Sequence, residues 1–255
     1  MDFGIRDRKQ PDGDQRTAHL VRRQLNRLIV AGILLIALVH VTVGDRLRKG
    51  SGHRAARIWV NIGARLTGLH FETCGAGGSK PVGLQLLVAN HSSPLDIAAV
   101  LATHPSARFV AGADLFKIPL LGAAMRALGT VPVDRRSGSG RLTVADPQEP
   151  GVLAVFPEGA IAPLGQRLPF HRGAFALAIE ARADVVPVAI HHSAARLPPK
   201  GALAVRPGTV VVEYLPSIST LSLVLEDRYR LSDQVERAIV SALDSSDGGG
   251  RQVLP

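Results

Sequence analysis

The chain has 255 residues and 46% of them are hydrophobic, so it can bury a sizeable core and is not expected to be disordered. A formal net charge of +9 points to an anionic partner, which charge alone does not identify. Only 4% of the residues are aromatic, and no segment alternates Phe or Tyr with Lys or Arg as a base-stacking surface requires, which argues against nucleic acid.

Cysteine and histidine usage indicates neither disulfides nor a metal site. Cys74 is the single cysteine, which rules out an internal disulfide and favours a reducing compartment. The adjacent His191 and His192 fit the polar end of a strand better than a metal site. We therefore expect no metal and no cofactor, and the sequence gives no indication of an oligomeric state.

The N-terminal region begins with polar and charged residues 1–17, which we expect to form a mobile tail. Residues 28–44 contain no charged side chain and are at the lower end of the length needed to cross a bilayer. The basic residues that flank this run are more numerous after it than before it, which favours a cytoplasmic main domain. A cleaved signal peptide and a buried core helix remain alternatives for this run.

Residues 55–69 place Ile58, Trp59, Ile62 and Leu66 close to one helical face. This pattern fits a helix that lies along lipid with its Trp at the headgroup level, and equally a helix that packs on the main domain. Residues 18–70 are therefore predicted to be membrane-associated helices.

From residue 71 to 246, short apolar runs alternate with helical patterns. We expect strands at 83–90, 107–112, 130–134, 151–156, 185–191 and 209–215, helices at 94–104, 118–129 and 173–183, and a closing helix from about Ser232. This alternation predicts an α/β domain with a mixed, largely parallel sheet flanked by helices, whose ligands gather at the carboxyl ends of the strands. Residues 135–150 are loop-like, and 247–255 are expected to be a disordered tail.

The segment "NHSSPLD" places His91 directly after an expected strand and Asp96 five residues later. A neutral imidazole can take a proton from a hydroxyl group, and a carboxylate on its other ring nitrogen fixes the tautomer. The same letters also spell a helix cap, with Ser93 as the N-cap and Asp96 at the third helical position. Spacing alone favours catalysis and capping equally, and both can hold.

Two further segments carry polar groups at strand ends. Lys117 and Arg135 lie around the expected helix and strand of "FKIPLLGAAMRALGTVPVDRR", where guanidinium groups suit phosphate contacts or form a solvated basic edge. In "FPEGA", Glu158 stands beside Gly159 after a strand. This Glu is placed to bond a substrate hydroxyl, to position the backbone, or simply to form a turn.

Taken in order, "NHSSPLD", "GTVPVDR", "FPEGA" and "VVPVAI" resemble the four sequence blocks of the glycerolipid acyltransferases typified by lysophosphatidate acyltransferase. The linking segments "FKIPLLG" and "PFHRGAFALA" are also similar to that family. The resemblance covers about residues 84–190.

The resemblance implies transfer of a fatty acyl group from a thioester of coenzyme A or acyl carrier protein to the free hydroxyl of a membrane lysolipid, most simply 1-acylglycerol-3-phosphate. It assigns His91 as the general base and Asp96 as its partner, with direct attack and no acyl-enzyme. Substrate would be bound by residues matched to the family's blocks and links, namely Lys117, Arg135, Glu158, Gly159 and Arg172.

Two departures from the family concern the substrate. The family usually continues Phe-Pro-Glu-Gly with Thr or Ser and then Arg, whereas Ala160 and Ile161 occupy these positions here. Either Arg167 or Arg172 supplies the missing cation, or the acceptor has another headgroup, for example a lyso-ornithine lipid. The loop at 135–150 also replaces a helix usual in the family.

Two functions of other classes remain open. One is a non-catalytic lipid-binding protein. The other is a hydrolase with Ser92 or Ser93 as the nucleophile, although the chain has no Gly-x-Ser-x-Gly segment.

Overall fold

The computed structural model, which describes residues 13–75, 83–133, 151–199 and 204–247, contains one seven-stranded sheet. The strands are β1 (Leu69–Gly75), β2 (Leu84–Ala89), β3 (Arg108–Gly112), β4 (Val131–Val133), β5 (Gly151–Val155), β6 (Asp184–His191) and β7 (Gly208–Tyr214). Their spatial order is β1-β7-β6-β2-β5-β3-β4, and only the pair β6 and β7 is antiparallel. The predicted mixed, largely parallel sheet is confirmed.

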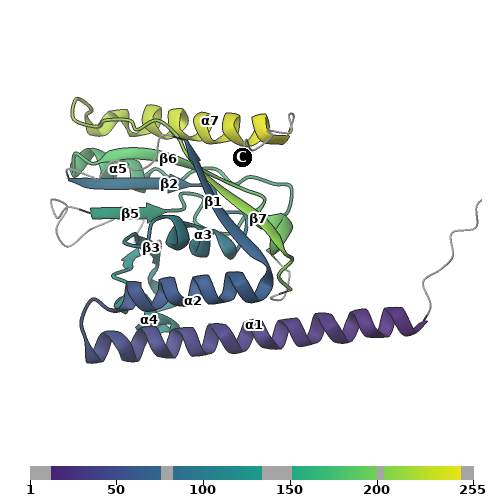
Figure 1. The fold of residues 1–255 in the computed structure, drawn as a ribbon. Coiled ribbons are helices and arrows are strands. Elements are labelled where there is room, and N and C mark those ends of the chain that lie inside the picture. Colours follow the sequence, from purple (N-terminus) through teal and green to yellow (C-terminus); the bar gives the residue numbers. More distant parts are fainter. Residues whose placement is uncertain (1–12, 76–82, 134–150, 200–203, 248–255) are drawn as a thin grey trace, which may run out of the picture.

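Helices cover both faces of the sheet (Figure 1). On one face lie α2 (Gly52–Thr67), α3 (Leu95–Thr103) and α4 (Leu121–Ala127), with α1 (Gly13–Leu47) outside them. On the other face lie α5 (Gly173–Glu180) and α7 (Arg228–Asp247). The connections contain three short helices: η1 (Ala113–Lys117), α6 (Ser193–Arg196) and η2 (Leu225–Asp227).

The central strands are buried on both sides, which is why they are continuous apolar runs in the sequence. In β2, Leu87 and Ala89 pack into the core on the α3 side, while Leu86 and Val88 pack into the core on the α5 and α7 side. Because β2 lies between β5 and β6 and is parallel to both, the carboxyl ends of these three strands meet at one edge of the sheet.

The N-terminal helices form an antiparallel pair (Figure 1). Helix α1 begins at Gly13, inside the segment 1–17 that we expected to be a tail. Among the described residues, α1 alone contains a segment, Val30–Leu47, that is long and apolar enough to cross a membrane, and most of that segment is not buried by the protein. In α2, Ala55 and Ala56 pack into the domain core, and the Trp59 indole N–H donates to His40 Nδ1 of α1 at 3.0 Å.

Three local expectations were wrong. The closing helix begins at Arg228 rather than near Ser232, because Leu231 also packs into the core beneath it. The helix expected at 118–129 is shorter: within that range only α4 is helical, and it begins after Leu120, whose φ is +63°. Strand β1 was not expected at all. The loop at 135–150 and the tail beyond 247 lie outside the described residues.

Gly52 of α2 packs directly against the backbone of Ala127 in α4. A Cβ atom at Gly52 would lie 2.5 Å from the carbonyl oxygen of Ala127, whereas one at Gly63, in the same helix, would meet nothing within 4 Å. We expect Gly52→Ala to lower the free energy of unfolding by about 1–3 kcal/mol, and Gly63→Ala to raise it by about 0.5–1 kcal/mol through helix propensity. Denaturant unfolding of both variants measures this, and equal effects would contradict the packing.

Candidate active site

The edge formed by the carboxyl ends of β2, β5 and β6 gathers three of the four sequence blocks. His91 follows β2, the segment from Phe156 to Gly159 follows β5, and His191 ends β6. The blocks are far apart in sequence, and parallel pairing of the strands brings them together. This is the edge at which open α/β sheets bind ligands.

His91 and Asp96 form a hydrogen-bonded pair. His91 Nδ1 lies 2.9 Å from Asp96 Oδ2, and the Asp96 side chain is completely buried. A carboxylate at Nδ1 assigns the ring proton to that nitrogen, because the carboxylate only accepts. The lone pair of Nε2 is then available, and no described residue forms a hydrogen bond with Nε2. The His91 side chain is 12% exposed, so it remains accessible from outside the protein.

The same carboxylate oxygen caps helix α3. Besides His91, Asp96 Oδ2 accepts the backbone N–H groups of Ser92 and Ser93, both at 2.8 Å. In return, the Ser93 hydroxyl accepts the backbone N–H of Leu95 at 3.1 Å. The helix itself begins at Leu95, one residue after the expected start. The capping and pairing interpretations of "NHSSPLD" are therefore both present, on one carboxylate.

Glu158 fixes the backbone of His91. Its Oε1 accepts the His91 N–H at 2.8 Å, and its Oε2 accepts the Leu168 N–H at 3.2 Å. The His91 carbonyl in turn accepts the N–H of Ala162 at 2.9 Å. Burial raises the pKa of the Glu158 carboxyl, and the two N–H bonds oppose that rise. Both Glu158 oxygens are thus occupied by the protein's own backbone.

Phe156 and Gly159 shape the turn around His91. The Phe156 ring stacks on the imidazole, with a centroid distance of 4.2 Å and an interplanar angle of 18°. Gly159 has a φ of +71°, a conformation that favours glycine, and its N–H donates to the Phe156 carbonyl at 3.0 Å. The stacked ring restricts rotation of the imidazole plane.

Asn90 is a residue of the site that the sequence interpretation missed. Its buried side-chain amide donates to the Ile190 carbonyl at 3.1 Å and accepts the Ile190 N–H at 2.7 Å. It thereby replaces a backbone pair where the ladder of β2 and β6 ends. A polar residue directly after an apolar strand and directly before His91 was the available signal.

The predicted substrate-binding cations do not contact this pair. Lys117 is exposed and pairs with Asp114 at 3.6 Å, and the Arg172 guanidinium lies 5.3 Å from the centroid of the Tyr229 ring on α7. Arg167 also contacts α7, through Asp244. Arg135 lies outside the described residues. Substrate binding by these residues stays a prediction.

The hydroxyl groups of Ser92 and Ser93 are engaged elsewhere. The Ser92 hydroxyl lies 3.0 Å from that of Ser193, and the fully buried Ser93 hydroxyl donates to the Leu197 carbonyl at 2.7 Å. Neither hydroxyl is hydrogen-bonded to His91. This arrangement does not activate a serine nucleophile.

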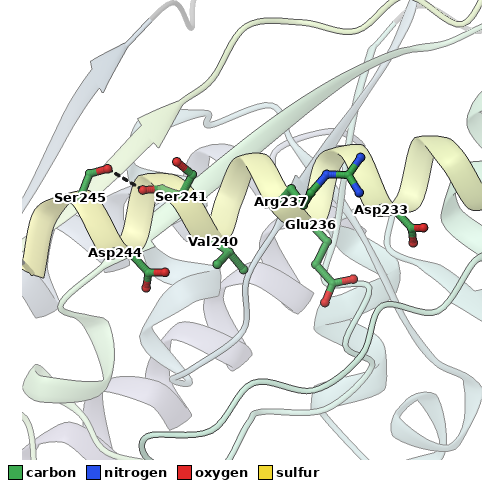
Figure 2. Close-up of a pocket in the computed structure, with 7 residues that line it drawn as sticks. All are labelled: Asp233, Glu236, Arg237, Val240, Ser241, Asp244 and Ser245. Carbon is green, nitrogen blue, oxygen red and sulfur yellow. Dashed lines mark hydrogen bonds between the residues drawn. The ribbon is translucent and has the colours of Figure 1, made fainter.

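A surface depression lies along α7, and the described residues that line it all belong to that helix (Figure 2). Its residues are Asp233, Glu236, Arg237, Val240, Ser241, Asp244 and Ser245. Helix α7 covers the sheet face opposite α3, so the depression is separate from the His91 and Asp96 pair. The chemistry therefore centres on the sheet edge.

Known proteins are similar to this chain in sequence. A family model described as Acyltransferase matches residues 79–191, which include both members of the pair. The chain is 30% identical over 189 residues to the 1-acyl-sn-glycerol-3-phosphate acyltransferase of Helicobacter pylori, covering 71% of this chain and 76% of the relative. It is 28% identical over 228 residues to 1-acyl-sn-glycerol-3-phosphate acyltransferase alpha of Mus musculus, covering 86% of this chain and 80% of the relative.

The fold also has a counterpart of known structure. The crystal structure of PlsC, the 1-acyl-sn-glycerophosphate (LPA) acyltransferase from Thermotoga maritima, matches with a TM-score of 0.70 and 21% identity, covering 91% of this chain and 99% of that chain. The fold, the sequence blocks and the relatives all indicate the same family. The chain belongs to the lysophosphatidate acyltransferase-like family of glycerolipid acyltransferases and is an acyltransferase.

Proposed function

We propose that this enzyme transfers a fatty acyl group from acyl-CoA or acyl carrier protein to the free hydroxyl of 1-acylglycerol-3-phosphate, giving phosphatidate. The observation that carries the proposal is the hydrogen bond between His91 Nδ1 and Asp96 Oδ2, which leaves Nε2 without a described partner. The relatives named for 1-acyl-sn-glycerol-3-phosphate support this acceptor.

In the proposed reaction His91 Nε2 takes the proton of the acceptor hydroxyl as its oxygen attacks the thioester carbonyl carbon. Asp96 stabilises the imidazolium that forms and holds the ring in orientation. The tetrahedral intermediate collapses, the carbon–sulfur bond breaks, and the thiolate takes the proton from the imidazolium. The ester bond replaces the thioester bond, and no acyl-enzyme is formed.

We further propose that the enzyme works on a membrane, with the catalytic domain on the cytoplasmic face. The apolar segment Val30–Leu47 supports this, because most of it is not buried by the rest of the protein. Its exposed large side chains are Leu34, Leu35, Ile36, Val39, Val43 and Leu47. Basic residues after the segment, including Arg54 and Arg57 on the exposed side of α2, suit an anionic lipid surface.

A second acceptor class is favoured by one observation. Ala160 and Ile161 follow Gly159, and both Arg167 and Arg172 contact side chains of α7 rather than the His91 and Asp96 pair. An acceptor with a headgroup other than a phosphate monoester, such as a lyso-ornithine lipid, is compatible with that arrangement.

We expect the purified protein in detergent to convert 1-acylglycerol-3-phosphate to phosphatidate with at least one of the two thioester donors. His91→Ala should reduce kcat by about 10²–10⁴-fold, because the general base is removed. Mass spectrometry of the products from a panel of lysolipids with each donor measures both the acceptor and the donor. Activity of His91→Ala equal to that of the wild type would refute the mechanism.

Asp96→Asn separates charge from shape. Its amide oxygen can still accept the N–H groups of Ser92 and Ser93, but the imidazolium loses its anionic partner. We expect a stable protein whose kcat falls by about 10²–10⁴-fold. The matched control is Asp233→Asn on the exposed side of α7, which should keep full activity. Unchanged turnover of Asp96→Asn would leave this residue as a helix cap alone.

The raised pKa of Glu158 predicts that the stability of the folded protein depends on pH. Burial raises the pKa of its carboxyl above the ordinary 4.5, so the folded protein binds this proton more tightly than the unfolded chain does. The resulting stabilisation is complete below pH 4.5 and is lost as the pH rises through the raised pKa. We expect the Tm of the wild type, measured relative to Glu158→Gln, to fall over this range and then level off. Parallel curves of Tm against pH would contradict the assignment, and Glu226→Gln serves as the exposed control.

A further inference from the structure

Ser193 is a buried hydroxyl residue that the proposed reaction does not use. It begins α6, two positions after the last residue of β6, and has no solvent exposure. Its hydroxyl lies 3.0 Å from the hydroxyl of Ser92, a residue 101 positions away in the chain. Buried hydroxyl groups are almost always hydrogen-bonded, and Ser92 is the partner that the structure provides.

The Ser92–Ser193 bond is the middle of a ladder of side-chain hydrogen bonds that joins the turn after β2 to the turn after β6. The Asn90 amide bonds the backbone of Ile190 on one side, and the Ser93 hydroxyl bonds the Leu197 carbonyl on the other. The backbone pairing of β2 and β6 ends at these turns, so side chains continue it. Within the ladder, the link between Ser92 and Ser193 is the one formed by two side chains.

Ser92 connects this ladder directly to the His91 and Asp96 pair. It is covalently next to His91, and its backbone N–H is one of the three donors to Asp96 Oδ2. A shift of Ser92 therefore moves both the imidazole and one donor that holds the carboxylate. Hydrogen bonds weaken steeply with misalignment, so small shifts affect the pair.

The backbone before Ser193 is held in an uncommon conformation. His192 has a φ of +64°, a left-handed conformation that non-glycine residues rarely adopt. The Ser193 carbonyl then accepts the N–H of Leu197 at 2.8 Å, which closes the single turn of α6. The fold thus maintains a strained residue immediately before the one whose hydroxyl reaches Ser92.

We propose that Ser193 is a positioning residue for acyl transfer. Through the Ser92 hydroxyl it fixes the turn that supports Asp96, and so sets the orientation of the His91 imidazole without touching substrate. This inference rests on the proposed roles of His91 and Asp96. In Ser193→Ala, the partly exposed Ser92 hydroxyl loses its partner and turns toward water, which draws the Ser92 N–H away from Asp96.

The test compares steady-state kinetics of four variants in the thioester assay. We expect Ser193→Ala to lower kcat roughly 10-fold with an unchanged KM for the lysolipid, and Ser193→Thr, which keeps the hydroxyl, to recover most of the loss. Ser92→Ala removes the same bond from its more exposed partner and should show the same loss. Ser232→Ala is the matched control, because its hydroxyl on α7 is equally buried and has no hydrogen-bond partner among the described residues.

A double-mutant cycle decides whether the two hydroxyls act as one unit. The Ser92→Ala/Ser193→Ala enzyme should lose no more activity than either single variant, because both substitutions remove the same hydrogen bond. Losses that multiply, a wild-type kcat for Ser193→Ala, or a loss matched by Ser232→Ala would overturn the proposal. The proposal would also be overturned if Ser193→Ala lost activity together with a lowered melting temperature while a folded Ser92→Ala kept full activity.

His91→Ala in the same assay separates this inference from the proposed function. An inactive His91→Ala together with a fully active Ser193→Ala would leave the mechanism standing and remove only the positioning role. A fully active His91→Ala would remove both, because no catalytic pair would remain to be positioned.

Discussion

The carboxylate of Asp96 is the interaction on which the site depends. A carboxylate with no solvent exposure is unfavourable unless hydrogen-bond donors surround it, and here three N–H groups converge on one oxygen. Two of the donors belong to the backbone of the turn after β2 and the third to the imidazole of His91. The turn, the start of α3 and the orientation of His91 therefore form together, because each lacks its hydrogen-bond partner without the others.

The groups around that carboxylate act mainly on the backbone rather than on a substrate. Glu158 receives the His91 N–H, Ala162 donates to the His91 carbonyl, and Asn90 bonds Ile190. A block such as "FPEGA" can thus be required for activity through the position of a residue in another block.

The sequence predicted the parts of this molecule that depend on local pattern. The buried strands β2, β5 and β6 are continuous apolar runs, and the pairing of His91 with Asp96 follows from a spacing that also caps a helix. Strand β1 was missed because most of its residues are exposed, and the apolar alternation of "LHFETCG" is confined to its first four residues. The contacts of Asn90 and Ser193 join residues about a hundred positions apart, and only the sheet order reveals them.

The pairing of β1 with β7 gives the N-terminal region a structural role in the sheet itself. All seven residues of β1 lie in register with β7, from Leu69 beside Gly208 to Gly75 beside Tyr214. A shortened chain that starts at β2 would expose the edge of β7, with its unpaired N–H and C=O groups, to other strands, and such edges promote aggregation. Helices α1 and α2 therefore cannot be replaced by another N-terminal segment unless β1, the strand that follows them, is kept.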